Sequence, residues 1–293
     1  MIAIDWGTTS LRAFRIDADG QVLETRRSDE GVLAAAGRFE SVLRHAIDGW
    51  DDASILMSGM IGSRQGWREV PYVECPAGLD EIARAMVPLD APELIDRNAW
   101  LVPGMSVQID GRSRDVMRGE ETQISGLLDS LSAGRHLVCL PGTHSKHVEV
   151  EDGRIERFHT AMTGELFDVL CRHSLLGRLM QFPAPHDPGA FATGVDDASK
   201  AGDLLAHLFA VRTKGLFADL EPSALPSYLS GLLIGHELND LPDRAESLHL
   251  IAGEPLLNRY HEALCRRGFR SHSHPDVLAA RGLFALAGRR NLR

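Results

Sequence analysis

The chain opens with a short apolar run, a polar turn and a second strand-like segment, and residues 21–26 then alternate between apolar and polar, a pattern typical of β-strands. The second and third of these strands are joined at Asp19-Gly20, a pair that favours a tight two-residue turn. Apolar side chains then recur at helical spacing, and a short apolar strand follows. The predicted order is therefore β-β-β-α-β, with elements at residues 1–4, 11–16, 21–26, 39–47 and 54–57.

The same pattern begins again in the middle of the chain. Apolar residues 137–140 lead into a polar turn, and the alternating segments 147–150 and 154–160 are joined at Asp152-Gly153. The sequence thus predicts an α/β protein with two domains, residues 1–110 and 111–293, and a cleft between them. Further elements are expected as strands at 100–102 and 248–251 and as helices at 122–131, 165–179, 201–217, 226–238, 256–267 and after Pro275.

Each repeat carries a polar turn suited to gripping phosphate. In the first turn Gly7 permits positive φ and close backbone approach, and Asp5 at the strand end suits a hydrated magnesium ion. Hydroxyl and amide donors follow from Thr8, Thr9 and Ser10. The second turn reads Pro141-Gly142-Thr143-His144-Ser145-Lys146. Two such strand-turn-strand loops indicate two facing half-sites for one nucleotide.

Composition narrows the class of protein. With 44% hydrophobic and 25% charged residues, and no apolar run of the ~18 residues that span a membrane, we expect a globular enzyme with no membrane segment. No secretion signal begins the sequence, so we expect a cytoplasmic location. A net charge of −10 argues against nucleic acid as a partner, and an anionic substrate would need local arginines.

Cysteine and histidine spacing supports no metal centre. The cysteines at 75, 139, 171 and 265 form no C-x-x-C pair, so we expect reduced, mostly buried thiols rather than a zinc site. The thirteen histidines form no ligand constellation, and His272-x-His274 reads as a polar loop. Gly231 and Gly235, four residues apart on a predicted helix, favour close helix packing.

Residues 58–67 form a glycine-punctuated loop that is too polar for a core. Ser58 offers a hydroxyl, Arg64 a cation, Gln65 an amide and Trp67 an aromatic wall. The alternative for Trp67 is a partly buried core residue. Such a loop is a candidate site for a polar ligand.

The duplicated unit with a phosphate turn in each copy resembles the actin-like ATPase superfamily, to which sugar kinases and hexokinases belong. Asp5-Trp6-Gly7-Thr8-Thr9 matches its first phosphate motif, Gly142-Thr143-His144 its second, and Ile251-Ala252-Gly253 its adenosine motif. The resemblance implies two ribonuclease H-like domains, each a mixed sheet flanked by helices. More closely, the chain resembles the 2-dehydro-3-deoxygalactonokinases in residues 5–12, 58–67, 118–123, 140–146, 162–167 and 227–237.

This family resemblance implies ATP-dependent phosphorylation of the terminal C6 hydroxyl of 2-dehydro-3-deoxy-D-galactonate, giving the 6-phosphate and ADP in galactonate and galactose catabolism. The implied partners are the sugar acid, ATP and Mg²⁺, and a homodimer is an open option. The alternatives are a kinase for another sugar acid or polyol and a phosphohydrolase of the same fold. A hydrolase would release phosphate without any sugar acceptor.

Roles at the nucleotide follow from position in these motifs. Asp5 is expected to hold the metal through water, and Thr8, Thr9, Gly142 and Thr143 are expected to bind the β- and γ-phosphates. Lys146 is expected to add a point charge, with a solvated lysine as the alternative. Ser10, His144 and Gly253 complete the expected nucleotide contacts, although His144 also fits a turn without chemical duty.

Transfer to an alcohol calls for a carboxylate base. Related sugar kinases carry a catalytic aspartate in a Gly-Asp-Gln stretch, and Gly119-Glu120-Glu121-Thr122-Gln123 occupies that place here with a change to glutamate and an offset of one. Glu121 and Glu120 are therefore the candidates, and Asp115 is a competitor. Alternatively, the two glutamates only stabilise the start of the following helix.

The carboxylate of a sugar acid calls for an arginine fork. Arg64 is the first choice for this clamp, with Ser58, Gln65 and Trp67 beside it in the loop, and Arg118 is the alternative. Thr163 in Thr163-Gly164-Glu165 is expected to line the cleft at a helix start, or else to serve as that helix's N-cap.

Overall fold

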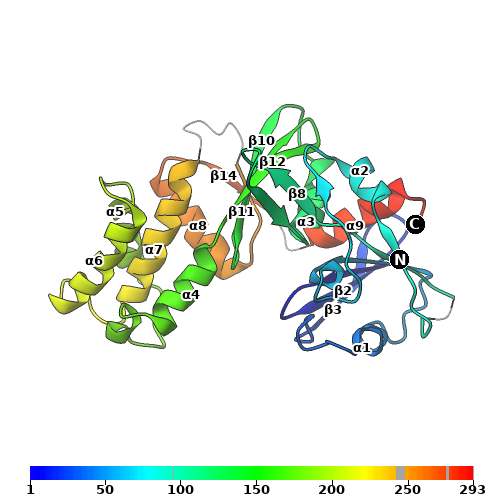
Figure 1. The fold of residues 1–293 in the computed structure, drawn as a ribbon, viewed down its shortest axis with the longest axis horizontal. Helices are drawn as coiled ribbons and strands as arrows, with labels where there is room; N and C mark the ends of the chain where they lie inside the picture. Colours follow the sequence, from blue (N-terminus) through cyan, green and yellow to red (C-terminus); the bar gives the residue numbers. More distant parts are fainter. Residues whose placement is uncertain (95, 242–247, 275–276, 293) are drawn as a thin grey trace. The chain divides into compact units, whose positions relative to one another are not determined.

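The computed structural model describes residues 1–94, 96–241, 248–274 and 277–292 (Figure 1). Mixed sheets and helices alternate along the chain, which confirms the α/β class. Tertiary contacts divide the chain into two compact units, one of residues 1–135, 148–159 and 275–293 and one of residues 136–147 and 160–274. The division of the fold into domains 1–110 and 111–293 stays a prediction. None of the described helices is long and apolar enough to cross a membrane.

The first sheet has the strand order β3-β2-β1-β4-β7-β6. Strand β1 pairs antiparallel with β2 and parallel with β4, which sets Asp5 opposite Arg12 on one side and Ser58 on the other. Ile2, Ile4 and Trp6 pack with Val42 and Leu43 of helix α1 in a buried core. The bounds are β1 Ile2–Trp6, β2 Leu11–Ile16, β3 Val22–Ser28, α1 Phe39–Ala46, β4 Ser54–Gly59, β6 Val87–Leu89 and β7 Asn98–Leu101.

A smaller sheet of order β5-β8-β9 and helices α2 and α3 complete the middle of the first unit. The sequence pattern missed α2 and these three strands, because they are short and their apolar residues form no clear period. The bounds are η1 Met60–Gly62, β5 Val73–Glu74, α2 Leu79–Arg84, β8 Met105–Gln108, β9 Arg114–Met117 and α3 Glu120–Leu128.

The other large sheet has the order β12-β11-β10-β13-β14, with β13 parallel to both β10 and β14. Its first four strands follow the neighbour order β3-β2-β1-β4 of the first sheet, so the repeat expected from the sequence exists in the strand order. The bounds are β10 Arg135–Leu140, β11 Ser145–Glu151, β12 Arg154–Ala161, β13 Leu248–Leu250 and β14 Ser271–Ser273.

Strand β14 corrects the prediction of a polar loop at His272 and His274. His274 donates its backbone N–H to the Leu250 carbonyl, and its imidazole lies 2.8 Å from that of His249. Burial, followed by His274, His136 and His272, lowers the pKa of His249 to about 4. The imidazoles of β10, β13 and the end of β14 therefore lie together, around His249.

Helices dominate the second unit, and α5 and α7 pack closely through glycines. A Cβ at Gly231 would lie 2.0 Å from the Phe191 carbonyl oxygen, and one at Gly235 would lie 2.6 Å from the Ala198 Cβ, which confirms the predicted packing role. The described bounds are α4 Thr163–His173, η2 Gly177–Leu179, α5 Pro188–Asp197, α6 Leu204–Leu216, α7 Leu225–Glu237, η3 Leu238–Asp240 and α8 Glu254–Arg266. Helix α9, Leu278–Arg289, belongs to the first unit and packs against α3.

One helix predicted in this region is too long, and another helix was not predicted. The helix expected to run from 165 to 179 ends at His173, because Ser174 has an extended backbone. The unpredicted helix is α5: Asp187 is its N-cap, the Asp187 carboxylate accepts the Ala190 N–H at 2.9 Å, and Pro188 occupies the first turn.

Candidate active site

The first polar turn is built by backbone hydrogen bonds. The Gly7 N–H donates to the Ser10 carbonyl, and the Gly7 carbonyl accepts the Val32 N–H, each at 2.9 Å. Thr8, Thr9 and Ser10 are exposed, so their hydroxyl and amide groups face outward from a fixed turn.

The glycine that this turn requires is Gly31, which the sequence reasoning missed. A Cβ at Gly31 would lie 2.4 Å from the Thr8 carbonyl oxygen, whereas one at Gly7 would lie 3.6 Å from its nearest neighbour. Gly7 does not adopt the positive φ that was expected of it. Gly7 thus leaves room for a ligand, and Gly31 lets a second segment pack behind the turn.

Asp5 lies one residue before the end of β1 and pairs with Arg12 across the sheet. The Arg12 Nη2 is 2.5 Å from the Asp5 Oδ2, and both side chains are mostly shielded from solvent. Because carboxylate oxygen is the ligand type that Mg²⁺ prefers, Asp5 fits the role of a magnesium residue. With Arg12 already neutralising part of its charge, contact through a water molecule suits this carboxylate better than direct coordination.

Two glycines bring the ends of β1 and β4 against the start of α3. Gly59 has φ +91°, and a Cβ there would lie 2.7 Å from the Trp6 carbonyl oxygen and 3.5 Å from the Asp5 carboxylate. Gly119 has φ +108°, and a Cβ there would lie 3.3 Å from the Gly59 Cα. The Asp5 region and the glutamates that follow Gly119 are therefore neighbours within the first unit.

The two glutamates at the start of α3 differ in environment. The Glu120 carboxylate accepts the Arg118 N–H at 2.9 Å and is partly exposed. Glu121 is fully buried; its carboxyl accepts the Gly119 N–H at 2.7 Å and lies 3.1 Å from the Thr122 hydroxyl. Burial, and then the neighbouring Glu120, raise the pKa of Glu121 to about 8. Both carboxylates thus accept backbone N–H groups of the two residues that precede α3.

The segment 58–67, predicted as one loop, begins inside β4 and presents its polar residues unevenly. Ser58 belongs to β4 and is buried, and its hydroxyl lies 3.5 Å from the Ile4 carbonyl oxygen. The Arg64 side chain, in the loop after β4, is 86% exposed and lies 3.4 Å from the Glu69 carboxylate. Gln65 is exposed. The ring of Trp67 stacks on that of Phe39, with the ring centroids 6.3 Å apart, and packs against the core. Trp67 is therefore partly buried, which is the alternative given for it in the sequence analysis.

The Arg118 side chain contacts Val70 and Tyr72, which follow this loop in the chain. Its Nη2 donates to the Val70 carbonyl at 2.8 Å, and its guanidinium lies over the Tyr72 ring at 4.4 Å. Its Nε and Nη1 are buried without a hydrogen-bond partner among the described residues. A Cβ at Gly62 would lie 3.1 Å from Nη1. Arg118 is thus packed into the structure, whereas Arg64 is open to solvent.

The second polar turn is held by the start of α4. The Glu165 N–H donates to the Thr143 carbonyl at 2.9 Å, and the Glu165 carboxylate bonds to the His144 imidazole. A Cβ at Gly164 would lie 2.4 Å from the Gly142 carbonyl oxygen, so only glycine permits this approach. The sequence reasoning had named neither Gly164 nor Glu165 as a support of the turn.

Lys146, just past this turn, is only 4% exposed, and its Nζ lies 3.4 Å from the His144 carbonyl oxygen. The alternative of a solvated lysine was therefore wrong. Gly253 precedes α8 at φ −70°, is exposed, and has open space where a Cβ would lie.

Thr163 begins α4 and contacts another part of the second unit. Its hydroxyl donates to the Glu237 carboxylate, while the N-cap position belongs to Met162. The alternative of Thr163 as N-cap was therefore wrong.

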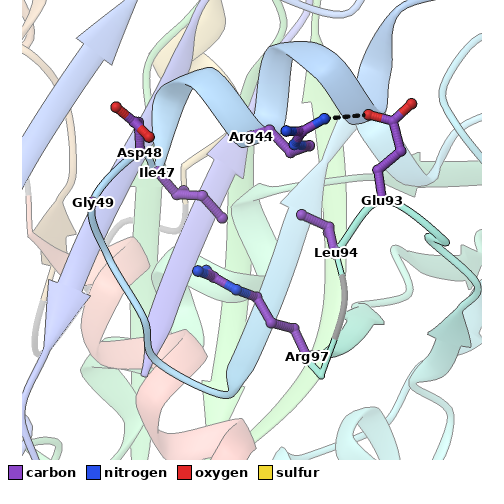
Figure 2. A pocket seen from close by; sticks show the side chains of 7 residues that line it. All are labelled: Arg44, Ile47, Asp48, Gly49, Glu93, Leu94 and Arg97. Atoms are coloured by element: carbon purple, nitrogen blue, oxygen red, sulfur yellow. Dashed lines mark hydrogen bonds and ion pairs between the residues drawn. The ribbon is translucent and has the colours of Figure 1, made fainter.

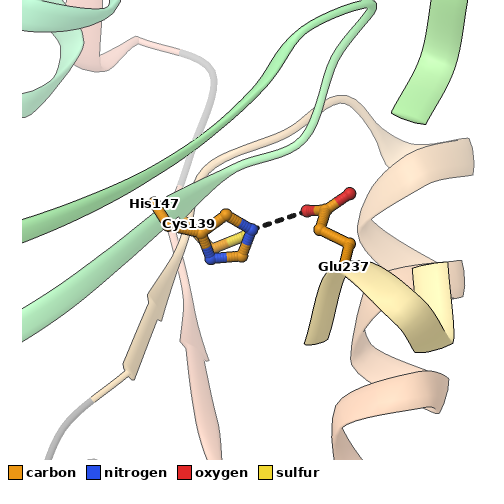
Figure 3. Close-up of side chains that lie close together, drawn as sticks. All are labelled: Cys139, His147 and Glu237. Atoms are coloured by element: carbon orange, nitrogen blue, oxygen red, sulfur yellow. Dashed lines mark hydrogen bonds and ion pairs between the residues drawn. The ribbon is translucent and has the colours of Figure 1, made fainter. Parts of the chain in front are cut away.

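The second unit also contains a buried group that sequence spacing did not reveal. Cys139, His147 and Glu237 place their ligand-type atoms within 4.8 Å of one another (Figure 3). The His147 Nε2 lies 2.7 Å from the Glu237 Oε1 and 4.0 Å from the Cys139 Sγ. Although burial opposes a charged imidazole, Cys139 and Glu237 raise the pKa of His147 above its usual range.

A surface pocket of about 230 Å³ lies in the first unit between α1 and the segment before β7 (Figure 2). The Arg44 Nη1 and the Glu93 carboxylate form an ion pair at 2.7 Å beside it, and Arg97 lines it. A second pocket of about 380 Å³ follows α4. None of the residues predicted for the active site lines either pocket.

Comparison with known proteins places the chain in a family. The family model described as 2-keto-3-deoxy-galactonokinase matches residues 5–286. A protein of Rhizobium meliloti (strain 1021) named "Probable 2-dehydro-3-deoxygalactonokinase DgoK1" is 42% identical over 243 residues, which cover 80% of this chain and 78% of that protein. The 2-dehydro-3-deoxygalactonokinase of Escherichia coli (strain K12) is 36% identical over 273 residues, covering 91% of this chain and 90% of the relative.

A solved structure agrees. A crystal structure from Sinorhizobium meliloti, provisionally assigned as a 2-dehydro-3-deoxygalactonokinase, superposes with a TM-score of 0.89 at 38% identity and covers 98% of this chain and 95% of its own. The family model covers both polar turns, the loop after β4 and the glutamate pair. The chain therefore belongs to the 2-keto-3-deoxy-galactonokinase family.

Proposed function

We propose that this chain is a sugar-acid kinase that uses ATP to phosphorylate the C6 hydroxyl of 2-dehydro-3-deoxy-D-galactonate, giving the 6-phosphate and ADP. The observation that carries the substrate assignment is the family match over residues 5–286. Two relatives with that activity in their names align over most of the chain, which supports the same choice.

We further propose two actin-like domains, residues 1–110 and 111–293, with the nucleotide bound in a cleft between them. The repeated strand order β3-β2-β1-β4 and β12-β11-β10-β13 supports this division, since each copy carries one polar turn after its first strand. Closure over both substrates would keep water away from ATP.

At the nucleotide, Thr8, Thr9 and Ser10 would donate to phosphate from the first turn, and Gly142, Thr143 and His144 from the second. Lys146 would contribute its charge nearby, and Gly253 would let the adenosine approach the start of α8, where a Cβ would meet no atom within 4 Å. When bound, Mg²⁺ neutralises charge on the phosphates, and Asp5 would hold it through water.

For the acceptor, we propose Glu121 as the general base, with Glu120 as the alternative in the same stretch. Its raised pKa supports this role, because a base poised near neutral pH is efficient. So does its place two residues after Gly119, which lies against Gly59. The base would take the proton of the C6 hydroxyl as that oxygen attacks the γ-phosphorus.

For the carboxylate end of the substrate, we propose Arg64 as the clamp. Its exposed guanidinium is available for a bidentate bond, whereas Arg118 is packed against Tyr72. Ser58, Gln65, Trp67 and Thr163 remain proposed substrate contacts, with Ser58 acting from a buried position.

The deciding experiment is a coupled ADP-release assay with ATP, Mg²⁺ and a panel of 2-keto-3-deoxy sugar acids, including a reaction without acceptor. We expect ADP only with the galactonate derivative. ADP release with another acid or a polyol would show that this other compound is the substrate. Release without any acceptor would identify a phosphohydrolase. No release with any compound would contradict the proposed kinase.

A further inference from the structure

Glu237, the last residue of α7, is the centre of a buried hydrogen-bond network in the second unit. Its Oε1 lies 2.7 Å from the His147 Nε2 on β11 (Figure 3). Its Oε2 accepts the Tyr260 hydroxyl of α8 at 2.7 Å and the Thr163 hydroxyl of α4. The Glu237 and His147 side chains are 1% and 0% exposed. One carboxylate thus joins α4, α7, α8 and β11.

The contact between His147 and Glu237 has the geometry of a hydrogen bond rather than of a shared metal ion. Two ligand atoms about 2.0 Å from one tetrahedral ion lie about 3.3 Å apart, and the separation here is 2.7 Å. Both Glu237 oxygens already accept hydrogen bonds. The network is therefore a structural ion pair with two hydroxyl donors.

The network reaches the second polar turn from both sides. On the strand side, the Ser145 hydroxyl, directly after the turn, lies 2.9 Å from the Tyr260 hydroxyl. On the helix side, Thr163 precedes Gly164 and Glu165, whose contacts hold Gly142, Thr143 and His144.

We propose that Glu237 is a positioning residue for the nucleotide: its carboxylate locks the start of β11 to the start of α4 and so sets where Thr143 and His144 meet the phosphates. This inference rests on the proposed kinase function. Glu237 itself is buried and touches no reacting atom. Its loss should weaken ATP binding more than sugar-acid binding, because the proposed acid clamp, Arg64, lies in the other unit and Glu237 contacts only Thr163 among the proposed substrate residues.

Two tyrosines provide a matched test. Tyr260 and Tyr228 are 1% and 0% exposed, and each donates its hydroxyl to a carboxylate at 2.7 Å, Glu237 in one case and Asp197 in the other. Tyr260→Phe and Tyr228→Phe each remove one tyrosine–carboxylate bond, and Tyr260→Phe also removes the contact with the Ser145 hydroxyl. We expect a loss of Tm in both variants, larger for Tyr260→Phe, but an increase of about tenfold in the KM for ATP only for Tyr260→Phe. The KM for the sugar acid should stay within about twofold in both, the range of ordinary context effects.

Equal KM values for ATP in the two variants would overturn the inference. If Tyr260→Phe does not fold, Ser145→Ala removes only the strand-side link and should raise the KM for ATP about threefold, a fraction of one hydrogen bond. Glu237→Gln should have the largest effect, since its amide nitrogen would face two donors. A wild-type protein without kinase activity would refute the proposed function instead, and the Kd of ADP in the two tyrosine variants, measured by calorimetry, would still decide the positioning role.

Discussion

At the scale of single residues, exposed arginines allow the proposed recognition of the substrate carboxylate to be tested. Arg64 and Arg84 are both exposed arginines with a loose ion pair to a nearby glutamate, at 3.4 and 3.6 Å. Only Arg64 lies in the loop proposed for the sugar acid. Neither ion pair should stabilise the fold by more than about 1 kcal/mol. Alanine variants of the two arginines therefore separate an effect on substrate binding from an effect on the stability of the fold.

We predict that Arg64→Ala raises the KM for the sugar acid by about 10- to 100-fold, as expected for loss of a charge-assisted bond, with little change in the KM for ATP. Arg84→Ala should change neither value. Steady-state kinetics with each substrate varied in turn measures both. An unchanged KM for the acid in Arg64→Ala would remove Arg64 from the clamp.

The glutamate pair yields a prediction about pH. Since burial raises the pKa of Glu121 to about 8, kcat/KM should increase with pH up to about that value if Glu121 is the base. Glu121→Gln should lower kcat by about 10²- to 10⁴-fold and abolish this pH limb. If Glu120→Gln has this effect instead, the base is the neighbouring residue; if only Asp115→Asn does, the base lies on β9.

The same shift predicts the stability of the variant. The folded-state pKa of Glu121 is above the ordinary value of about 4.3, so between about pH 4.3 and 8 the folded state binds more protons than the unfolded state. Stability therefore falls as pH rises through this window. Glu121→Gln has no such dependence and should gain Tm relative to the wild type from pH 5 to 8. A constant difference in Tm would show that Glu121 is not neutral in the fold.

At the scale of elements, glycines control how strands and helices meet. Gly59 has positive φ and lies against the Trp6 carbonyl at the junction of β1 and β4, whereas Gly253 has φ −70° and open space at the start of α8. The fold therefore requires a glycine at position 59. At position 253 the fold requires none, so a requirement there would come from a ligand.

We predict that Gly59→Ala destabilises the protein by about 2 kcal/mol or more, from backbone strain and a steric clash. Gly253→Ala should change the free energy of unfolding by no more than about 0.5 kcal/mol. It should raise the KM for ATP if adenosine approaches this backbone. Thermal unfolding and kinetics of the two variants check both. An unaffected KM for ATP would remove Gly253 from the proposed nucleotide contacts.

At the scale of the whole molecule, binding and stability are linked. A ligand that binds only the folded state stabilises it by about 2.7 kcal/mol at a hundredfold excess over its Kd. We predict that ATP with Mg²⁺ raises the Tm of the wild type, and that the same excess over the wild-type Kd raises it less in Tyr260→Phe than in Tyr228→Phe. Thermal unfolding with and without nucleotide measures this. Equal shifts in the two variants would contradict the role of the Glu237 network.

Much of the fold was predictable because local patterns carry it. Alternation and Asp-Gly or Gly-rich turns placed β1, β2, β3 and β10, and helical spacing placed α1, α7 and α8 within a few residues. Short elements without a full period, such as α2 and β5, were missed. Helix α5 was missed because its Pro188 looked like a breaker, although proline is well tolerated in a first turn.

What the sequence by itself determined is most of the longer local elements, the two polar turns and the family. Their residues are contiguous, so spacing and side-chain type are enough to identify them. Only the tertiary structure decided which groups are buried and which meet: Gly31 behind the first turn, Gly164 behind the second, and Glu237 against His147, a residue 90 positions away. These contacts, and the raised pKa of Glu121, depend on packing between distant segments. No local pattern encodes such packing, because the partners are chosen by the fold as a whole.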